Sequence, residues 1–394
     1  MTPKTALAEA EPSISLARAS VLPLVLFCLG HFFIDLYSGA LGVLQPLLLE
    51  KYHLSFTQAG ILGGVLVFSS SVMQPVYGYL SDRFHTPLFS TLAPAVAGIF
   101  ISSLGLAPGY GGLLLMVWLG GAGIASFHPQ AAANATAGVR HNRGRAMAIF
   151  ICSGTLGLAL GPTLFSLVTG KVGLSRTAWA AAPGILVTLL LLALLRKLPE
   201  APHPRTRFDL APLRAVWKPM AILYFLVVIR SIVQVTFTQF LPLYLHSQRG
   251  YSLSQASFSL SLYLLGGAFG GLAGGNLADR LGGRWVILVS MLGSVPFLGI
   301  FLFTNGVISI AALALGGLLL LFTIPVNVVM AQELAPTQGG TVSALMMGFA
   351  WGLAGLVFIP LTGWVADHYS MQAAFIGLVL FPLLGFLLAL KLPK

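Results

Sequence analysis

Long apolar segments follow one another along almost the whole chain. A membrane-spanning helix needs about 20 such residues, and the breaks at glycine, proline and charge clusters define twelve segments. We expect spans at 21–49, 57–80, 87–106, 111–137, 145–170, 178–197, 218–246, 254–278, 284–304, 306–331, 340–366 and 371–391. Only 8% of the residues are charged, whereas soluble proteins carry about 25%. The sequence therefore predicts an all-α polytopic membrane protein.

A near-repetition divides these spans into two sets of six. The run GYLSDR at 78–83 returns as GNLADR at 275–280, and LSFTQA at 54–59 returns as YSLSQA at 251–256, both 197 residues later. Matches at one offset and in one order indicate duplication. We predict two pseudo-symmetric six-helix bundles at 21–197 and 218–394, an N-terminal tail at 1–20, and a linker at 198–217 that is rich in proline and charge.

Basic residues gather on one side of this predicted topology. With the N-terminus in the cytoplasm, the cytoplasmic segments carry 16 Lys and Arg residues and the opposite segments carry 4. Cytoplasmic loops of membrane proteins have such an excess. The net charge of +11 is therefore explained by topology, and we expect no nucleic-acid partner. Both termini are predicted to be cytoplasmic.

The repeated loop resembles a known signature. The run GNLADRLGGR at 275–284 is similar to the loop between helices 2 and 3 of the major facilitator superfamily, and the copy at 78–87 is a weaker match. The runs HFFID at 31–35, QPVYG at 74–78 and FHP at 127–129 resemble the fosmidomycin-resistance family of bacterial drug exporters. That family usually continues the third run with Glu, and this chain has Gln130. The resemblance implies a transporter of the bacterial inner membrane.

The charged residues of the two repeated loops, here called the corner residues, are predicted to be gating elements, as the superfamily resemblance implies. Such loop charges can pair across the cytoplasmic face and hold one state of two moving bundles, although they can also be solvated charges that only enforce topology. The residues concerned are Asp82, Arg83, Asp279, Arg280 and Arg284.

A second glycine-rich run lies in the fifth span. Gly157, Gly161 and Pro162 resemble the antiporter signature of superfamily exporters, but the trailing glycines of that signature are absent. Small residues allow close helix contact, and proline permits a bend. This run favours export over uptake.

Asp35 is the strongest candidate for proton coupling. A carboxylate at the centre of a membrane helix is expensive, and such residues are functional by default. His31 lies four residues earlier, on the same helical face. The two can share a proton or form an ion pair, and the alternative is a structural pair that orients the first helix.

Arg230 and His128 are the leading candidates for substrate binding. Arg230 lies within the seventh span and keeps its charge, so it needs an anion or water. Asp35 and an anionic substrate group are both possible partners, and snorkelling to the membrane surface is the alternative. His128 precedes Pro129 in the fourth span, where it lines a cavity or bonds to a neighbouring helix.

Four further residues complete the predicted substrate site: Gln74, Gln234, Tyr37 and Trp351. For each of them, helix packing is the competing role. The chain has no Gly-x-x-x-x-Gly-Lys-Ser/Thr run that would indicate ATP binding. It also has no metal-ligand spacing, and its ionisable groups are scattered over both halves. We therefore expect no enzyme activity, no cofactor and no metal.

The predicted function is proton-coupled secondary transport, with export of a small polar or anionic organic molecule or drug. A metabolite uptake symporter or facilitator of the same fold is the alternative. The expected partners are a small-molecule substrate, protons and the lipid bilayer, and the chain is expected to be a monomer.

Overall fold

The computed structural model describes residues 12–84, 86–135, 143–195 and 211–392 of the chain. Eleven of its helices are long and apolar enough to cross a membrane, and the shorter apolar helix Leu88–Ser102 adds a twelfth segment. All regular elements within these ranges are helical. The predicted all-α fold with twelve membrane segments is confirmed.

The first half of the chain contains six apolar segments, several of which are interrupted. Their elements are α1 (Pro12–Ser38) with α2 (Ala40–Tyr52), α3 (Phe56–Val67) with η1 (Phe68–Val72) and α4 (Gln74–Phe84), α5 (Leu88–Ser102) with η2 (Leu104–Leu106), α6 (Tyr110–Ala135), α7 (Arg143–Val172), and η3 (Leu174–Ala181) with α8 (Ala182–Leu195). Helix α1 begins at Pro12, so it enters the stretch 1–20 that was predicted as a tail.

The second half repeats this plan. Its elements are α9 (Ala211–Ala215) and α10 (Trp217–Arg249), α11 (Leu253–Leu281), α12 (Gly283–Phe303), α13 (Gly306–Leu320) with α14 (Thr323–Leu334), η4 (Pro336–Gln338) with α15 (Gly339–Ser343), η5 (Ala344–Phe349) and α16 (Ala350–His368), and α17 (Met371–Ala389). Residues 196–210 of the predicted linker lie outside the described residues, and α9 occupies part of the remainder.

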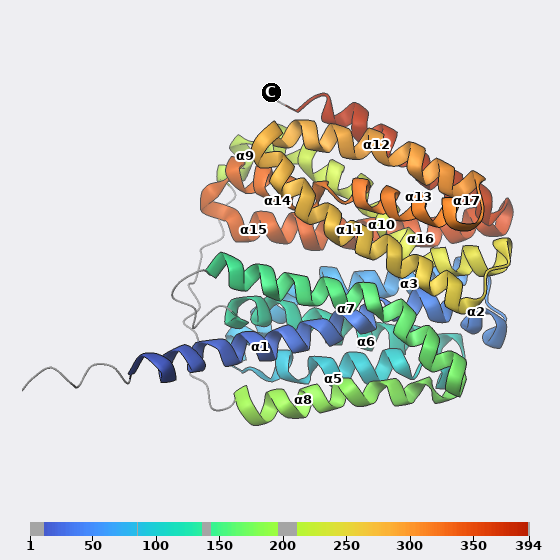
Figure 1. Ribbon diagram of the computed structural model, residues 1–394. Coiled ribbons are helices and arrows are strands. Elements are labelled where there is room, and N and C mark those ends of the chain that lie inside the picture. The colour runs from blue at the N-terminus through green and yellow to red at the C-terminus, as the bar shows by residue number, and fades with distance from the viewer. Residues whose placement is uncertain (1–11, 85, 136–142, 196–210, 393–394) are drawn as a thin grey trace, which may run out of the picture.

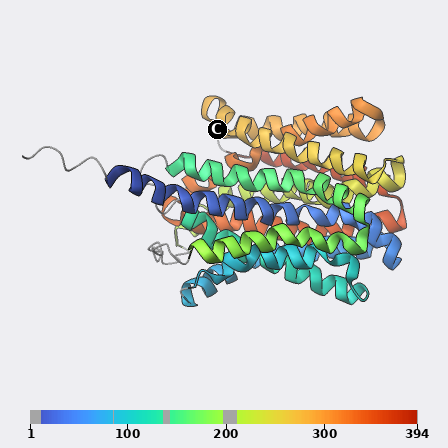
Figure 2. The same cartoon turned by 60° about the horizontal axis from the view of Figure 1, so that its bottom comes forward.

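The two halves form two stacked bundles whose helix axes are roughly aligned with one another. Helices α1 to α8 make the lower bundle in Figure 1, and α9 to α17 make the upper one. The same parallel arrangement is seen after rotation in Figure 2. The buried apolar side chains form two clusters, one centred on α1, α5 and α6 and the other on α10, α11 and α17. The second cluster also includes Ala59, Val67 and Ala159 of the first half.

Close contacts join the bundles, and glycine makes one of them possible. A Cβ atom at Gly60 in α3 would lie 2.7 Å from the backbone oxygen of Ile359 in α16. Helices of a membrane protein approach closely where residues are small. Farther round the interface, the hydroxyls of Thr163 in α7 and Ser261 in α11 are 2.8 Å apart and form a hydrogen bond.

A carboxylate at the end of α16 binds the start of α3 in the other bundle. The backbone N–H groups of Phe56 and Thr57 donate to Asp367 Oδ1 and Oδ2 at 2.9 and 2.8 Å, and the Thr57 hydroxyl donates to Oδ2 at 2.5 Å. The first N–H groups of a helix lack partners within it, and a negative charge is favourable there. Asp367 thus holds the two bundles together at this end.

Candidate functional site

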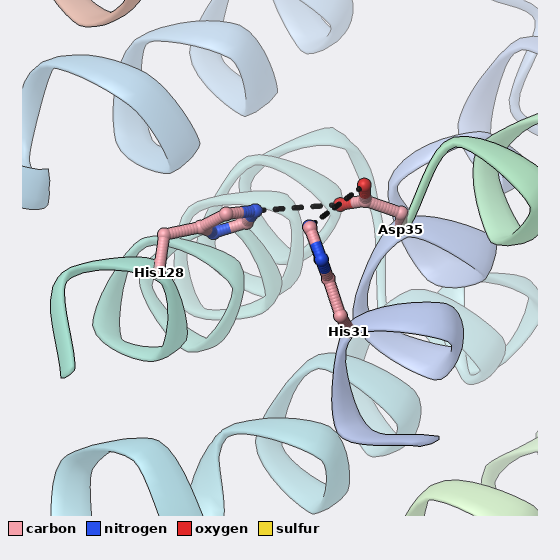
Figure 3. A group of neighbouring side chains, drawn as sticks. All are labelled: His31, Asp35 and His128. Atoms are coloured by element: carbon pink, nitrogen blue, oxygen red, sulfur yellow. Dashed lines mark ion pairs between the residues drawn. The ribbon is translucent and has the colours of Figure 1, made fainter. Parts of the chain in front are cut away.

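Asp35 lies between two histidines in the middle of the N-terminal bundle. His31 and Asp35 come from α1, and His128 comes from α6, as Figure 3 shows. His31 Nε2 is 3.3 Å from Asp35 Oδ2, and His128 Nε2 is 3.5 Å from Asp35 Oδ1. Four residues along a helix bring His31 and Asp35 onto one face. The structure therefore brings together three residues that the sequence analysis selected.

The far side of each imidazole is bonded to the backbone. His31 Nδ1 is 2.8 Å from the oxygen of Phe150 in α7, and His128 Nδ1 is 2.9 Å from the oxygen of Ile124 in α6. A carbonyl oxygen only accepts hydrogen bonds, so both Nδ1 atoms carry hydrogen and donate. In a neutral ring, the Nε2 atom that faces Asp35 then bears a lone pair.

This hydrogen-bond polarity favours binding of a proton by the cluster. With both rings neutral and Asp35 ionised, two nitrogen lone pairs face two carboxylate oxygens, which repel them. A proton on either ring, or on the carboxyl group, turns one of these contacts into an attraction. The side chains of Asp35 and His128 are 19% and 25% exposed, so water can reach the cluster. The arrangement can accept and release protons.

The three residues also have the donor spacing of a metal site. Their donor atoms all lie within 4.8 Å of one another, which is the spacing that a divalent cation requires. Each ring faces a different oxygen of Asp35, so the carboxylate can accept a hydrogen bond from either ring when that ring is protonated. The Nε2 lone pairs and carboxylate oxygens of the cluster can therefore bind either a proton or a cation.

Glycines of α7 allow this helix to lie directly on α1. The backbone oxygens of Phe32 and Leu36 occupy the places where Cβ atoms of Gly157 and Gly161 would stand. Gly154 faces the cluster itself, and its Cβ would lie 2.6 Å from Asp35 Oδ2. Pro162 lies inside the continuous helix α7. The predicted close contact is observed, and no separate helix begins at the proline.

Arg230 lies in the other bundle, on α10, and is only 3% exposed. Its guanidinium donates to Gln234 Oε1 and, at 3.1 Å, to the Ser231 hydroxyl. The guanidinium carbon is 5.7 Å from the centre of the Trp351 ring in α16. Two of the predicted substrate-binding residues, Gln234 and Trp351, are therefore its neighbours.

The charge of Arg230 has no acidic partner among the described residues, where the ion pairs of Asp35 are with His31 and His128. Asp35, one of the two partners predicted for Arg230, therefore forms its ion pairs with other residues. The Nε atom of Arg230 is buried and makes no hydrogen bond. A buried cation needs compensation, and a guanidinium binds carboxylate or phosphonate groups well. The arrangement suits an incoming anion.

Tyr37 and Gln74 lie in other surroundings. Tyr37 is fully buried, donates to the oxygen of Ala180 and accepts from the N–H of Gly184, both at 2.9 Å. This bonding fastens α1 to the last segment of its own bundle, so the structure does not support a substrate-binding role for Tyr37. Gln74 donates to the oxygen of Ser70 at 2.9 Å, which is a contact within its own segment.

The predicted gating residues lie at the end of the bundles where α4 and α11 finish. Arg83 donates to the Tyr79 hydroxyl at 3.0 Å, and Arg284 donates to the oxygen of Leu390 at 3.0 Å. Asp279 and Arg280 are exposed, and the side chain of Asp82 lies outside the described part of the structure. No ion pair across the halves is formed by the corner residues that are described.

Two features of the site were missed by the sequence analysis. Tyr263 in α11 is fully buried, its hydroxyl has no hydrogen-bond partner, and its ring stacks at 5.4 Å on Phe237 of α10, the helix that carries Arg230. The π-helical turns η1 and η5 also face each other, since a Cβ at Gly348 would lie 3.5 Å from the oxygen of Ser71. Such turns are frequent at functional sites, and the run of three serines at 69–71 was the available signal.

The fold and these groups define a membrane protein of a particular class. Two related bundles are joined at one end, and each holds ionisable side chains within its apolar spans, as membrane transporters with internal repeats do. The chain belongs to the Major Facilitator Superfamily, whose sequence profile matches residues 27–358 and 224–394.

Individual relatives agree with this family. The chain is 30% identical to the fosmidomycin resistance protein of Escherichia coli (strain K12), over 96% of this chain and 95% of that protein. It is also 30% identical to the uncharacterized MFS-type transporter YfnC of Bacillus subtilis (strain 168), over 98% and 96%. The inward-facing, unoccupied crystal structure of a bacterial homologue of the lysosomal transporter Spinster has a TM-score of 0.79 at 16% identity, covering 96% of this chain and 97% of that chain.

Proposed function

We propose that this protein is a proton-coupled secondary transporter that exports a small polar or anionic organic molecule by alternating access. Asp35 with its two histidines supports this proposal most directly, because the hydrogen-bond polarity of the cluster leaves a place for a proton. Its location would be the bacterial inner membrane, with both termini in the cytoplasm, since the basic residues favour that side.

Arg230 supports an anionic cargo. It is buried in the bundle opposite Asp35, and its Nε is unpaired. The unpaired hydroxyl of Tyr263 belongs to a ring that stacks on the same helix, α10. In this proposal a carboxylate or phosphonate group of the substrate binds Arg230, while protons bind the Asp35 cluster. A difference in affinity between the two facing states then links the two movements. The name of the Escherichia coli relative makes fosmidomycin a suitable first substrate to test.

The test uses protein reconstituted in vesicles with an acidic lumen, oriented with the cytoplasmic face outward. Adding fosmidomycin outside should release protons from the lumen, and a pH-sensitive dye in the lumen reports this. Asp35→Asn should abolish the response, whereas substrate exchange without a gradient should continue. Glu50→Gln is the matched control, because Glu50 is an exposed carboxylate at the end of the same segment.

Two results would contradict the proposal. Gradient-driven transport by Asp35→Asn at the wild-type rate would exclude the cluster as the proton site. An uptake symporter of the same fold would not release lumenal protons when substrate is added outside, and would instead move substrate inward when the outer side is acidic. The direction of the dye response therefore separates export from uptake.

A further inference from the structure

An apolar groove lies at the start of α10, away from the candidate substrate site. It has a volume of about 320 Å³, and the residues that line it are Leu213, Trp217, Met220, Ala221, Tyr224, Phe225 and Leu345. Leu345 belongs to η5, so the groove runs between the seventh and eleventh membrane segments. None of the lining residues is charged. The groove offers apolar surface to an elongated apolar group.

The groove and Arg230 lie on different faces of α10. Ala221 and Arg230 are nine residues apart in one helix, which at 3.6 residues per turn places them on opposite sides. Arg230 is buried, whereas Trp217 and Phe225 are 61% and 53% exposed. The groove is therefore separate from the proposed anion site, and its rim is accessible from outside the bundle.

Two basic residues directly follow residues that line the groove. Lys218 is exposed, and its ammonium group lies 5.8 Å from the centre of the groove-lining Trp217 ring. Arg214, also exposed, directly follows Leu213 in α9. A tryptophan at the first residue of a membrane helix is typical of the interface between hydrocarbon and headgroups. The charges thus lie at headgroup level, and the apolar lining of α10 continues into the membrane.

We propose that this groove binds one anionic glycerophospholipid. An acyl chain lies against Trp217, Ala221 and Phe225, and the phosphate of the headgroup binds Lys218 and Arg214. The charge selects an anionic lipid over a zwitterionic one, because basic pockets at helix ends attract anionic headgroups. The site lies where α9, the last described piece of the connection between the halves, meets the second bundle.

Native mass spectrometry of the detergent-purified protein tests this proposal. Phosphatidylglycerol should bind at one saturable site with higher affinity than phosphatidylcholine of the same chain length. The double variant Arg214→Gln, Lys218→Gln should lose about 30-fold in affinity for phosphatidylglycerol, since each basic residue near the surface contributes roughly a fivefold effect. Its affinity for phosphatidylcholine should not change.

Two further variants test the groove and the specificity of the charge effect. Ala221→Phe fills the groove and should weaken binding of both lipids. Lys171→Gln with Arg176→Gln removes two exposed basic residues elsewhere and should leave both affinities unchanged. Melting temperatures in lipid-free detergent verify that each variant is folded. Equal affinity for the two lipids, or wild-type phosphatidylglycerol affinity in the Arg214/Lys218 variant, would overturn the proposal.

Discussion

Gly154→Ala is expected to disable proton coupling without removing any titratable group. Gly154 lies in α7 against the Asp35 cluster, and an added Cβ would be 2.5 Å from His31 Cε1 and 2.6 Å from Asp35 Oδ2. Ordinary contact begins at 3.4 Å, so the carboxylate must move by about 0.8 Å and the ring, whose Nε2 atom is closest to the added Cβ, by about 0.9 Å or more. The 3.3 Å contact between His31 and Asp35 cannot be retained unchanged after such a shift.

The size of the effect follows from the interaction that is lost. A hydrogen bond to a charged group contributes about 1.5–3 kcal/mol, which corresponds to a factor of roughly 10 to 150. We expect the gradient-driven transport rate at pH 7 to fall by that factor. The fold should be retained, because the helix propensity of alanine, up to about 1 kcal/mol above that of glycine, offsets part of the roughly 1–3 kcal/mol cost of overpacking.

The lumenal dye assay described for Asp35→Asn measures this rate, and thermal melting checks the fold. Gly170→Ala is the matched control, since Gly170 lies in the same helix and an added Cβ there meets nothing within 4 Å. A wild-type transport rate for Gly154→Ala, or an equal loss in Gly170→Ala, would refute the reasoning about the cluster.

Three other substitutions test separate parts of the structure. Arg230→Gln should raise the half-saturating concentration of an anionic substrate at least tenfold, by loss of a charged hydrogen bond, and should leave a neutral analogue unaffected in vesicle uptake. Tyr263→Phe should raise this concentration severalfold without lowering the melting temperature, because the buried hydroxyl makes no hydrogen bond to the protein; an unchanged concentration would contradict its role. Asp367→Asn should increase the ratio of separated to joined bundle ends by roughly 10- to 150-fold. Electron paramagnetic resonance distances between labels at positions 51 and 369 measure this ratio, and Glu50→Gln, which removes an exposed carboxylate outside this contact, is the control.

The cluster illustrates what the sequence could predict. His31 and Asp35 are one helical turn apart, so their contact follows from helix geometry. The approach of His128 depends on how α6 is rotated and placed against α1, which the spacing of residues within one helix does not determine. His128 was therefore selected from its motif and its position in a span, and its contact with Asp35 required the three-dimensional structure.

The environment of Arg230 shows what the sequence could not determine. The sequence indicated that a charge within the seventh span needs compensation, but it left Asp35, substrate and the membrane surface as alternatives. Gln234, one turn away, was identified, whereas Tyr263 was missed because a single hydroxyl in an apolar helix resembles a packing residue. The helix interruptions were also missed. Ser69 and Ser70 donate to the oxygens of Leu66 and Val67, and such local bonds compete with the helical ladder.

The bond between Asp367 and the start of α3 makes the two sides of this duplicated protein unequal. Asp367 follows Pro360 by seven residues, and the residue seven after the matching Pro162 is Thr169. The Thr169 hydroxyl donates to Phe165 in its own helix at 2.7 Å, so that corner has no equivalent carboxylate. Separation of the bundle ends would therefore start at the side of α7 and α11, and the side of α3 and α16 would separate last.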